Sequence, residues 1–145
     1  MPTTEDYFSL INHNDNLLEI ISLHVPGHLQ NEDFSDWKVT LTFYMICIYV
    51  KTYLDLIGID VQDHYTIKQH INTIDNLIPI AKNYRHVEEA SRDARYEGRK
   101  YDDTYLKNRI LPKYNQIRNK LIALLKKEYA GTKNIPNIKI EKYFI

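Results

Sequence analysis

The chain has 145 residues, of which 43% are hydrophobic and 26% charged, and its formal net charge is zero. These proportions exclude a disordered chain and suffice for one core, so we predict a single domain over residues 1–145. Four glycines and five prolines provide too few turns for a sandwich of short strands, and an all-α fold is expected instead. The single cysteine, Cys47, excludes a disulfide framework and favours a cytoplasmic location.

Charge is sorted along the chain. Residues 1–37 contain seven acidic residues and no lysine or arginine, whereas residues 107–133 contain eight basic residues and one acidic residue. A basic segment of this kind attracts phosphate-rich partners. The same basic segment also suits pairing with the acidic first helix, either within one chain or between two copies. We favour this pairing over a phosphate-rich partner.

The first two helices are predicted from apolar spacing and from helix-breaking residues. The first runs from about Asn14 to His24, with Leu17, Ile20 and Ile21 on its inward face, and His13 extends that face by one turn. The second runs from Ser35 to Ile57, a stretch without proline or glycine that Gly58 ends. Its apolar residues cover almost all sides, beginning at Trp37, as in a central buried helix. The segment Ile46–Val50 would also suit a strand, but the length of the whole run favours a helix.

The longest unbroken apolar run, Phe43–Val50, is far too short to span a bilayer, so no membrane anchor is predicted.

Later segments also carry helical signals. Asp63 is the expected N-cap of a short third helix, and a fourth helix begins near Leu77 or Pro79 and ends at Tyr96 before Gly98. The predicted inward face of the fourth helix consists of Leu77, Ile80, Tyr84, Val87, Ser91 and Ala94.

The fifth helix has apolar residues at spacings of three and four from Leu106 to Leu125, and Pro112 within it must kink the helix or begin a new segment. After Gly131, residues 132–145 are expected to form an extended C-terminal arm that packs on its own bundle or on a second subunit.

Residue patterns for metal or cofactor chemistry are weak. His24 and His28 are four residues apart, but Pro26 and Gly27 break the helix that would align them, and there is no HExxH motif. The glycines are scattered and form no phosphate-binding loop. Cys47 lies in an apolar run where a thiolate is disfavoured. We therefore assign no metal, no cofactor and no catalytic residue.

The fourth helix carries arginines along one side, at positions 85, 92, 95 and 99. Arginine suits phosphate contacts, and the neighbouring tyrosines Tyr84, Tyr96 and Tyr101 offer faces for base stacking, which together indicate a nucleic-acid surface. The simpler interpretation is a solvated helix face on which Glu88 and Glu89 pair with Arg85 and Arg92.

These residues together resemble bacterial members of the HEPN superfamily. The resemblance covers about His13 to Lys127 and depends on a set of scattered residues: His13, Asp36-Trp37, Phe43-Tyr44, Gly58, His64, Tyr84 and the string Ser-Arg-Asp-Ala-Arg-Tyr at 91–96. It implies a bundle of four to five helices, commonly dimeric, in a superfamily of RNA-cleaving toxins, nucleotide-binding modules and inactive interaction domains. Active members carry an arginine, a polar residue and, four to six residues later, a histidine. Arg118-Asn119 is the nearest match here, and no histidine follows it.

The sequence therefore predicts a non-catalytic HEPN-like module that binds RNA, a nucleotide or a partner protein as a homodimer, by analogy in a toxin–antitoxin or defence system. The candidate ligand-binding residues are expected to line a groove between the first, second and fourth helices: His13, Asp36, Trp37, Tyr44, His64, Arg92, Arg95 and Tyr96.

Three alternatives stay open. The same residues would also suit a buried polar network that fixes helix register. An enzyme, either a ribonuclease or a nucleotide-processing protein, would use His64 with Arg92 or Arg95. The third alternative is a purely structural dimerisation module.

Overall fold

The computed structural model describes residues 2–61, 63–97, 101–130 and 134–144 and shows an all-α bundle, as predicted. Its principal helices are α1 (Thr4–Leu23), α2 (Ser35–Leu56), α3 (His64–Thr73), α4 (Ala81–Tyr96) and α6 (Leu111–Glu128). A short helix, η1 (Gly27–Leu29), lies between α1 and α2. The described ranges contain no β-strand. The buried hydrophobic side chains form one cluster that extends from Phe8 to Phe144.

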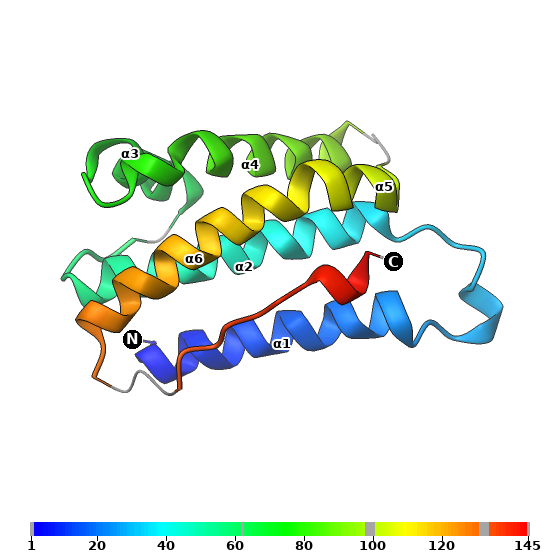
Figure 1. The fold of residues 1–145 in the computed structure, drawn as a ribbon, viewed down its shortest axis with the longest axis horizontal. Helices are drawn as coiled ribbons and strands as arrows, with labels where there is room; N and C mark the ends of the chain where they lie inside the picture. Colours follow the sequence, from blue (N-terminus) through cyan, green and yellow to red (C-terminus); the bar gives the residue numbers. More distant parts are fainter. Residues whose placement is uncertain (1, 62, 98–100, 131–133, 145) are drawn as a thin grey trace.

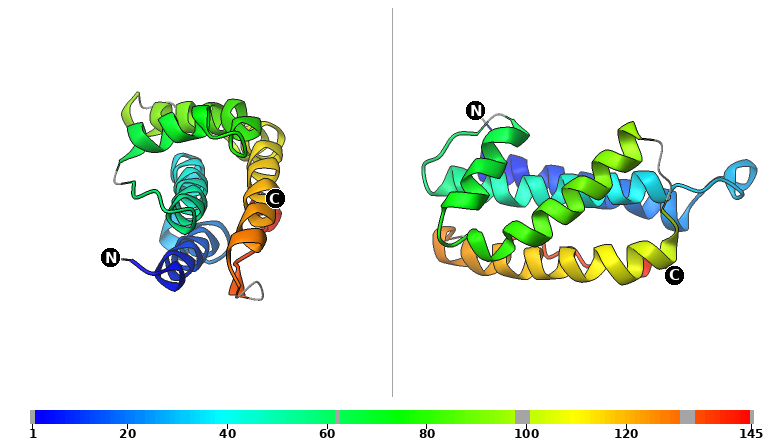
Figure 2. Two further views of the ribbon diagram at one scale, coloured as in Figure 1. Left: turned by 90° about the vertical axis from the view of Figure 1, so that its left-hand side faces the viewer. Right: turned by 90° about the horizontal axis from the view of Figure 1, so that it is seen from above.

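The helix α2 lies at the centre of the bundle, where it contacts α1, α4 and α6 (Figure 2). The segment Ile46–Val50 is helical, and Gly58 follows the helix with a φ of 88°, a left-handed conformation that favours glycine. Within the described chain, α2 is the one helix long and apolar enough to cross a bilayer, but most of it is buried by its neighbours. Such burial is typical of a core helix.

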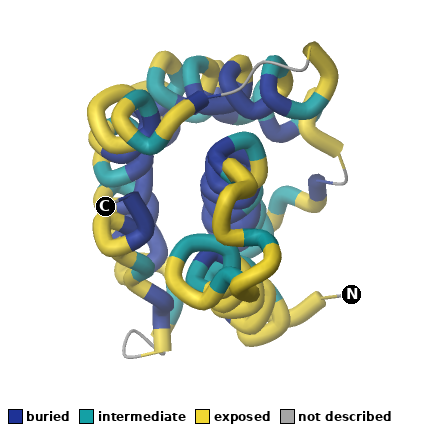
Figure 3. The backbone as a smooth tube through the Cα atoms, turned by 90° about the vertical axis from the view of Figure 1, so that its right-hand side faces the viewer, coloured by how far each residue is buried: buried dark blue, intermediate teal, exposed yellow. Residues whose placement is uncertain are grey.

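The helix α1 begins ten residues earlier than predicted. The Thr3 hydroxyl accepts a hydrogen bond from the Asp6 N–H at 3.1 Å, and the Asp6 carboxylate accepts one from the Thr3 N–H at 2.8 Å. This capping box starts the helix at Thr4. The inward face was predicted only in part: Phe8, Ile11 and Leu18 are buried and Ile21 packs against the core, but Leu17 and Ile20 are exposed. One side of α1 faces solvent (Figure 3).

The helices α3 and α4 follow the sequence signals closely. The Asp63 carboxylate caps α3 by accepting a hydrogen bond from the Thr66 N–H at 2.8 Å. A short helix, η2 (Ile78–Ile80), contains Pro79 and leads directly into α4. Every residue of the predicted inward face of α4 is buried. Gly98 and Arg99, which we expected at the end of this helix, lie outside the described residues.

Pro112 lies in the first turn of α6 and so marks where a new segment begins, which is one of the two predicted outcomes. The segments α5 (Asp103–Tyr105), η3 (Leu106–Ile110) and α6 are continuous, and η3 is a π-helical turn in which the Leu111 N–H bonds the Leu106 carbonyl. Because proline has no N–H to donate, a carbonyl in the preceding turn loses its α-helical partner. The wider turn of η3 accommodates that loss and lets the helix continue.

The C-terminal arm packs on its own bundle, between α1 and α6 (Figure 1). Its apolar residues Ile135, Ile140, Tyr143 and Phe144 are buried, and a short helix, η5 (Glu141–Tyr143), lies near its end. The Tyr143 hydroxyl donates to the Asp15 carboxylate at 2.7 Å. Because the arm occupies this position, the predicted pairing of an acidic first helix with a basic last helix within one chain is wrong: none of the ion pairs among described residues joins α1 to α6.

Candidate functional site

Four of the eight predicted site residues, His64, Arg92, Arg95 and Tyr96, line a groove formed by α2, α3 and α4, which we call the α3–α4 groove. The groove has a volume of about 260 Å³ and is lined by Phe43, His64, Tyr65, Lys68, Glu88, Arg92, Arg95 and Tyr96. The helix α4 contributes the residues at positions 88, 92, 95 and 96, which share one side of the helix at its C-terminal half. The site therefore brings cationic and aromatic side chains together.

Arg95 is the central cation of this site. Its Nη1 donates to the Tyr44 hydroxyl at 2.9 Å, and its Nε donates to the Ser91 carbonyl at 3.3 Å. The guanidinium also lies 5.5 Å from the ring centre of Tyr44 and 5.1 Å from that of Tyr96. All of these partners are uncharged, and no carboxylate of the described chain forms an ion pair with Arg95. The positive charge of Arg95 is therefore not neutralised by a neighbour.

Arg95 also lines a second hollow. It has a volume of about 270 Å³ and is lined by Asp36, Trp37, Thr40, Ala94 and Arg95. The Asp36 carboxylate accepts a hydrogen bond from the Trp37 N–H at 2.9 Å, in the first turn of α2. Arg95 is thus the shared wall of two hollows, each of which contains an aromatic side chain.

His64 forms part of the wall of the α3–α4 groove. Its Nδ1 lies 3.6 Å from Cys47 Sγ, and its ring stacks on Tyr44 with the ring centres 6.3 Å apart and the planes 16° apart. Burial, together with the positive charges of Lys51 and Arg95, lowers the pKa of His64 from its ordinary value of 6.5. The neutral form of the imidazole is therefore favoured.

Cys47 lies behind His64 and is unsuited to nucleophilic chemistry. It is buried, and its Sγ is 3.7 Å from the Tyr84 hydroxyl. Burial raises the pKa of the Cys47 thiol to about 12, so the thiolate is scarce at neutral pH. The residue contributes to the core, as its apolar sequence context predicted.

Glu88 distinguishes the two arginines of the groove. Its carboxylate lies 2.9 Å from Lys68 Nζ and 3.6 Å from Arg92 Nη2. The interpretation of paired charges on a helix face is therefore confirmed for Arg92. It does not extend to Arg95, which is one turn of α4 away from Arg92 and is bonded to neutral groups.

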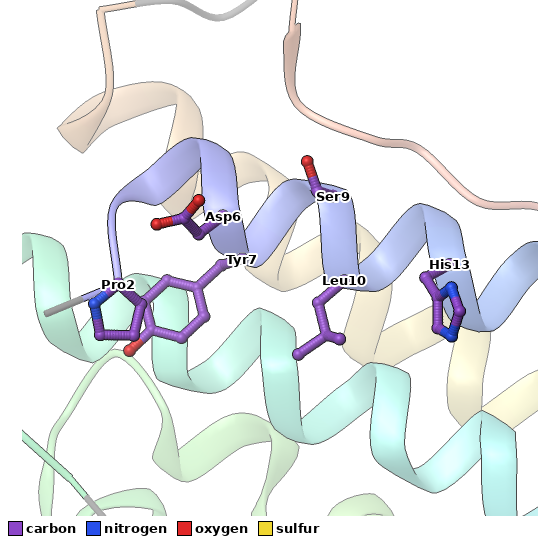
Figure 4. Close-up of a pocket in the computed structure, with 6 residues that line it drawn as sticks. All are labelled: Pro2, Asp6, Tyr7, Ser9, Leu10 and His13. Carbon is purple, nitrogen blue, oxygen red and sulfur yellow. The ribbon is translucent and has the colours of Figure 1, made fainter.

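His13 is the one predicted site residue that neither lines a hollow with Arg95 nor contacts it. His13 is on α1, on the same side as Tyr7 and Leu10, where it lines a different hollow with Pro2, Asp6 and Ser9 (Figure 4). The groove thus involves α3 in place of the expected α1. The resemblance alone had placed His13 with the other candidates.

The prediction also missed Tyr65 and Lys68, which α3 contributes to the groove. Their spacing from His64, at one and four residues, places Lys68 on the same side of α3 as His64. The four-residue spacing from His64 was the feature of the sequence that could have identified Lys68 as a groove residue.

No group of three or more His, Cys, Asp or Glu side chains in the described ranges is arranged to hold a metal ion. The chain matches no family model, no curated protein and no solved structure.

Proposed function

We propose that the α3–α4 groove binds a nucleoside phosphate, either as a free nucleotide or within a single strand of RNA, and that the protein is a non-catalytic binding module. The observation that carries this proposal is Arg95, a cation with uncharged partners at the wall between two hollows. Its remaining N–H groups suit the paired acceptor oxygens of a phosphate.

Exposed aromatic side chains supply the second half of the proposed recognition. Trp37 is 55% exposed in one hollow, and Tyr65 and Tyr96 are 72% and 73% exposed beside the other. Large aromatic rings on a surface offer faces on which bases stack, at about 1–3 kcal/mol per base. A phosphate on Arg95 with a base on either side is the ligand that matches this arrangement.

The groove offers little for bond cleavage. Transfer of an RNA 2′-hydroxyl proton and protonation of the leaving oxygen need a base and an acid. Among the residues that line the groove, His64 is the single imidazole, and the adjacent thiol of Cys47 is protonated. These features support binding without catalysis.

The proposal is tested by fluorescence anisotropy of a labelled single-stranded RNA at low salt. We expect Arg95→Ala and Tyr96→Ala each to weaken binding by about tenfold, equivalent to about 1.4 kcal/mol. Arg109→Ala is the matched control, because Arg109 is an exposed arginine of η3 outside the groove.

Competition with a mononucleotide and with unlabelled RNA then separates the two sources of the ligand. Equal competition per molecule indicates a free nucleotide, and stronger competition by the RNA indicates a strand. Absence of binding to either, or equal losses in the Arg109→Ala control, contradicts the proposal and leaves a partner protein as the occupant of the groove.

A ribonuclease is the second candidate, because His64 and Arg95 lie in the same groove and the imidazole is neutral and able to accept a proton. Incubation of the purified protein with labelled RNA tests it. Cleavage that disappears in both His64→Ala and Arg95→Ala would replace the binding function by an enzymatic one.

The resemblance to the HEPN superfamily supports a cytoplasmic module in a toxin–antitoxin or defence setting, which we keep as part of the proposal.

A further inference from the structure

The second hollow beside Arg95, which we call the Trp37 hollow, contains a carboxylate as well as a guanidinium. It lies where the first turns of α2 meet the last turn of α4, and it is lined by Asp36, Trp37, Thr40, Ala94 and Arg95. None of the ion pairs among described residues joins Asp36 to Arg95. The hollow therefore presents a cation and an anion separately to one ligand, which needs an acidic group for Arg95 and hydrogen-bond donors for Asp36.

Asp36 is the main acceptor in this hollow. Its half-buried carboxylate accepts a hydrogen bond from the Trp37 N–H at 2.9 Å. A carboxylate has about four acceptor positions on its two oxygens, so this one bond leaves others for a ligand. The Thr40 hydroxyl donates its proton to the Asp36 carbonyl at 2.8 Å, so it adds lone pairs and no donor. A base that enters the hollow has to bring donors of its own.

The exposed ring of Trp37 sets how such a base lies. A base that stacks on the face of the indole turns its edge toward the neighbouring side chains. The indole N–H lies in the plane of its ring, so it does not meet a base stacked on that face. Asp36 is the neighbour of Trp37 in the first turn of α2, and its carboxylate is therefore the group placed to meet the edge of the base.

Guanine is the base whose edge matches a carboxylate. It carries two adjacent donors, N1–H and the N2 amino group, which suit the two oxygens of one carboxylate as a bidentate pair. Cytosine and adenine each present an amino group beside a ring nitrogen that is an acceptor, and uracil presents one N–H between two carbonyls. Each of these bases turns a lone pair toward the carboxylate. Such edges are open for recognition in a single strand and in a free nucleotide.

We propose that the Trp37 hollow is a guanine pocket, in which Asp36 accepts from N1–H and from the N2 amino group while the base stacks on Trp37. The inference rests on the proposed function, because it assigns a base to the ligand whose phosphate Arg95 binds. Asp36 also lies in the first turn of α2, where a negative charge stabilises a helix. The test therefore measures the preference among bases, which a general loss of stability does not change.

Competition against labelled RNA, followed by fluorescence anisotropy, measures this preference. The competitors are short RNAs of uridine whose central base is guanine, adenine, cytosine or hypoxanthine. The corresponding mononucleotides are tested in parallel, because the proposed function admits a strand or a free nucleotide. We expect the wild-type protein to bind the guanine competitor about tenfold more tightly than the adenine or cytosine competitor. Hypoxanthine keeps N1–H but lacks the amino group, so its competitor should fall between them.

Asp36→Asn is the variant that isolates the carboxylate. Its amide keeps the shape of the side chain but presents one donor and one acceptor, a pair that matches the amino group and adjacent ring nitrogen of adenine. The preference for guanine over adenine should fall by about tenfold, to near unity.

Glu32→Gln is the matched control, because Glu32 is an exposed acidic residue shortly before α2 and outside the lining of the hollow. Loss of a negative charge alone strengthens binding of every RNA. The control should therefore leave the preference among bases within about twofold of wild type. Circular dichroism establishes that each variant is folded, and the preference of the wild-type protein tests the proposal without any variant.

Two results would overturn the guanine pocket while the proposed function stands. The first is binding of the guanine competitor by wild-type protein that is no tighter than binding of the adenine or cytosine competitor. The second is a guanine preference that folded Asp36→Asn retains in full. Absence of binding to any RNA or nucleotide is a different outcome, because it contradicts the proposed function and the guanine pocket together.

Discussion

Arg95 of α4 and Arg118 of α6 have similar neighbours but different surroundings. Each donates a hydrogen bond to a backbone carbonyl, Arg95 to that of Ser91 and Arg118 to that of Ile138 at 2.9 Å. Each also lies over a tyrosine ring. Arg118 is buried beneath the C-terminal arm, whereas Arg95 is partly exposed between two hollows. The comparison teaches that access to solvent, and not the type of partner, separates a structural arginine from one free to bind a ligand.

Side chains of α2 and α6 hold the arm in place through several polar contacts. The Tyr114 hydroxyl donates to the Ile138 carbonyl at 3.0 Å, and the Tyr49 hydroxyl donates to that of Pro136. Lys38 Nζ lies 3.1 Å from the Asp103 carboxylate and 3.2 Å from the Tyr143 carbonyl. Burial raises the pKa of Tyr49 to about 12, so its hydroxyl stays protonated as a donor. These contacts make the arm part of the core.

The largest expected effect comes from the apolar end of the arm. Phe144 is buried, so Phe144→Ala should lower the free energy of unfolding by about 3 kcal/mol, through lost burial and a cavity. Trp37→Ala, which removes an exposed aromatic ring, should change it by under about 0.5 kcal/mol. Urea denaturation measures both. Equal effects would mean that the arm does not pack on the bundle as described.

A pair of variants at the two arginines sharpens the comparison directly. Arg118→Ala should cost about 2 kcal/mol of stability, because it leaves the buried Ile138 carbonyl without a charged donor, and it should leave RNA affinity unchanged. Arg95→Ala should cost under about 1 kcal/mol and weaken RNA binding by about tenfold. Denaturation and anisotropy on the same preparations give both quantities. The distinction fails if Arg118→Ala also loses RNA affinity while it remains folded.

The pH dependence should have opposite signs for folding and for binding. Because the folded-state pKa of His64 is below its ordinary value of 6.5, the unfolded chain takes up the proton more readily, and stability falls as the pH drops below about 6.5. Burial also lowers the pKa of His86, which adds an effect of the same sign. A bound phosphate favours the charged imidazole of His64, so RNA binding should tighten over the same range.

His64→Gln separates these contributions. The variant should remove the tightening of RNA binding at low pH while the part of the stability change due to His86 remains. Denaturation and anisotropy at a series of pH values provide the comparison. Tightening that persists in His64→Gln would place the titrating group elsewhere.

Much of the fold was predictable because local signals were unambiguous. Proline-free and glycine-free sequence between Ser35 and Gly58 predicted α2, and the Asp63 cap and the buried face of α4 were also predicted correctly. The start of α1 was missed because the polar run Asn12–Asn16 interrupts the apolar pattern inside the helix, well after its capping box. Its orientation was missed because α1 has apolar residues on two sides, and periodicity does not tell which side meets the core.

The site was predictable in part for a related reason. Cationic and aromatic residues such as Arg95 and Tyr96 stand out within one helix, so the sequence indicated them. Whether a charge is neutralised depends on residues brought from other helices, such as Lys68, which pairs with Glu88 across twenty positions of the chain. Spacing within a helix carries no information on such pairs. His13 was misplaced for the same reason, since its neighbours depend on how α1 packs.

The smallest expected effect concerns Glu88, which partly neutralises the groove. Glu88→Gln keeps the shape of the side chain but releases Lys68 and Arg92 from their ion pairs. RNA binding should therefore tighten by about threefold. The slope of the logarithm of the binding constant against the logarithm of salt concentration should steepen by up to about one unit. Glu89→Gln is the matched control, because Glu89 is the adjacent exposed acidic residue and lies outside the groove lining. Weaker binding by Glu88→Gln alone would show that the carboxylate itself contacts the ligand or holds Lys68 and Arg92 in position. In that case recognition would not depend on Arg95 alone. The comparison of Arg95 with Arg118 would then have to take the ion pairs of Arg92 into account.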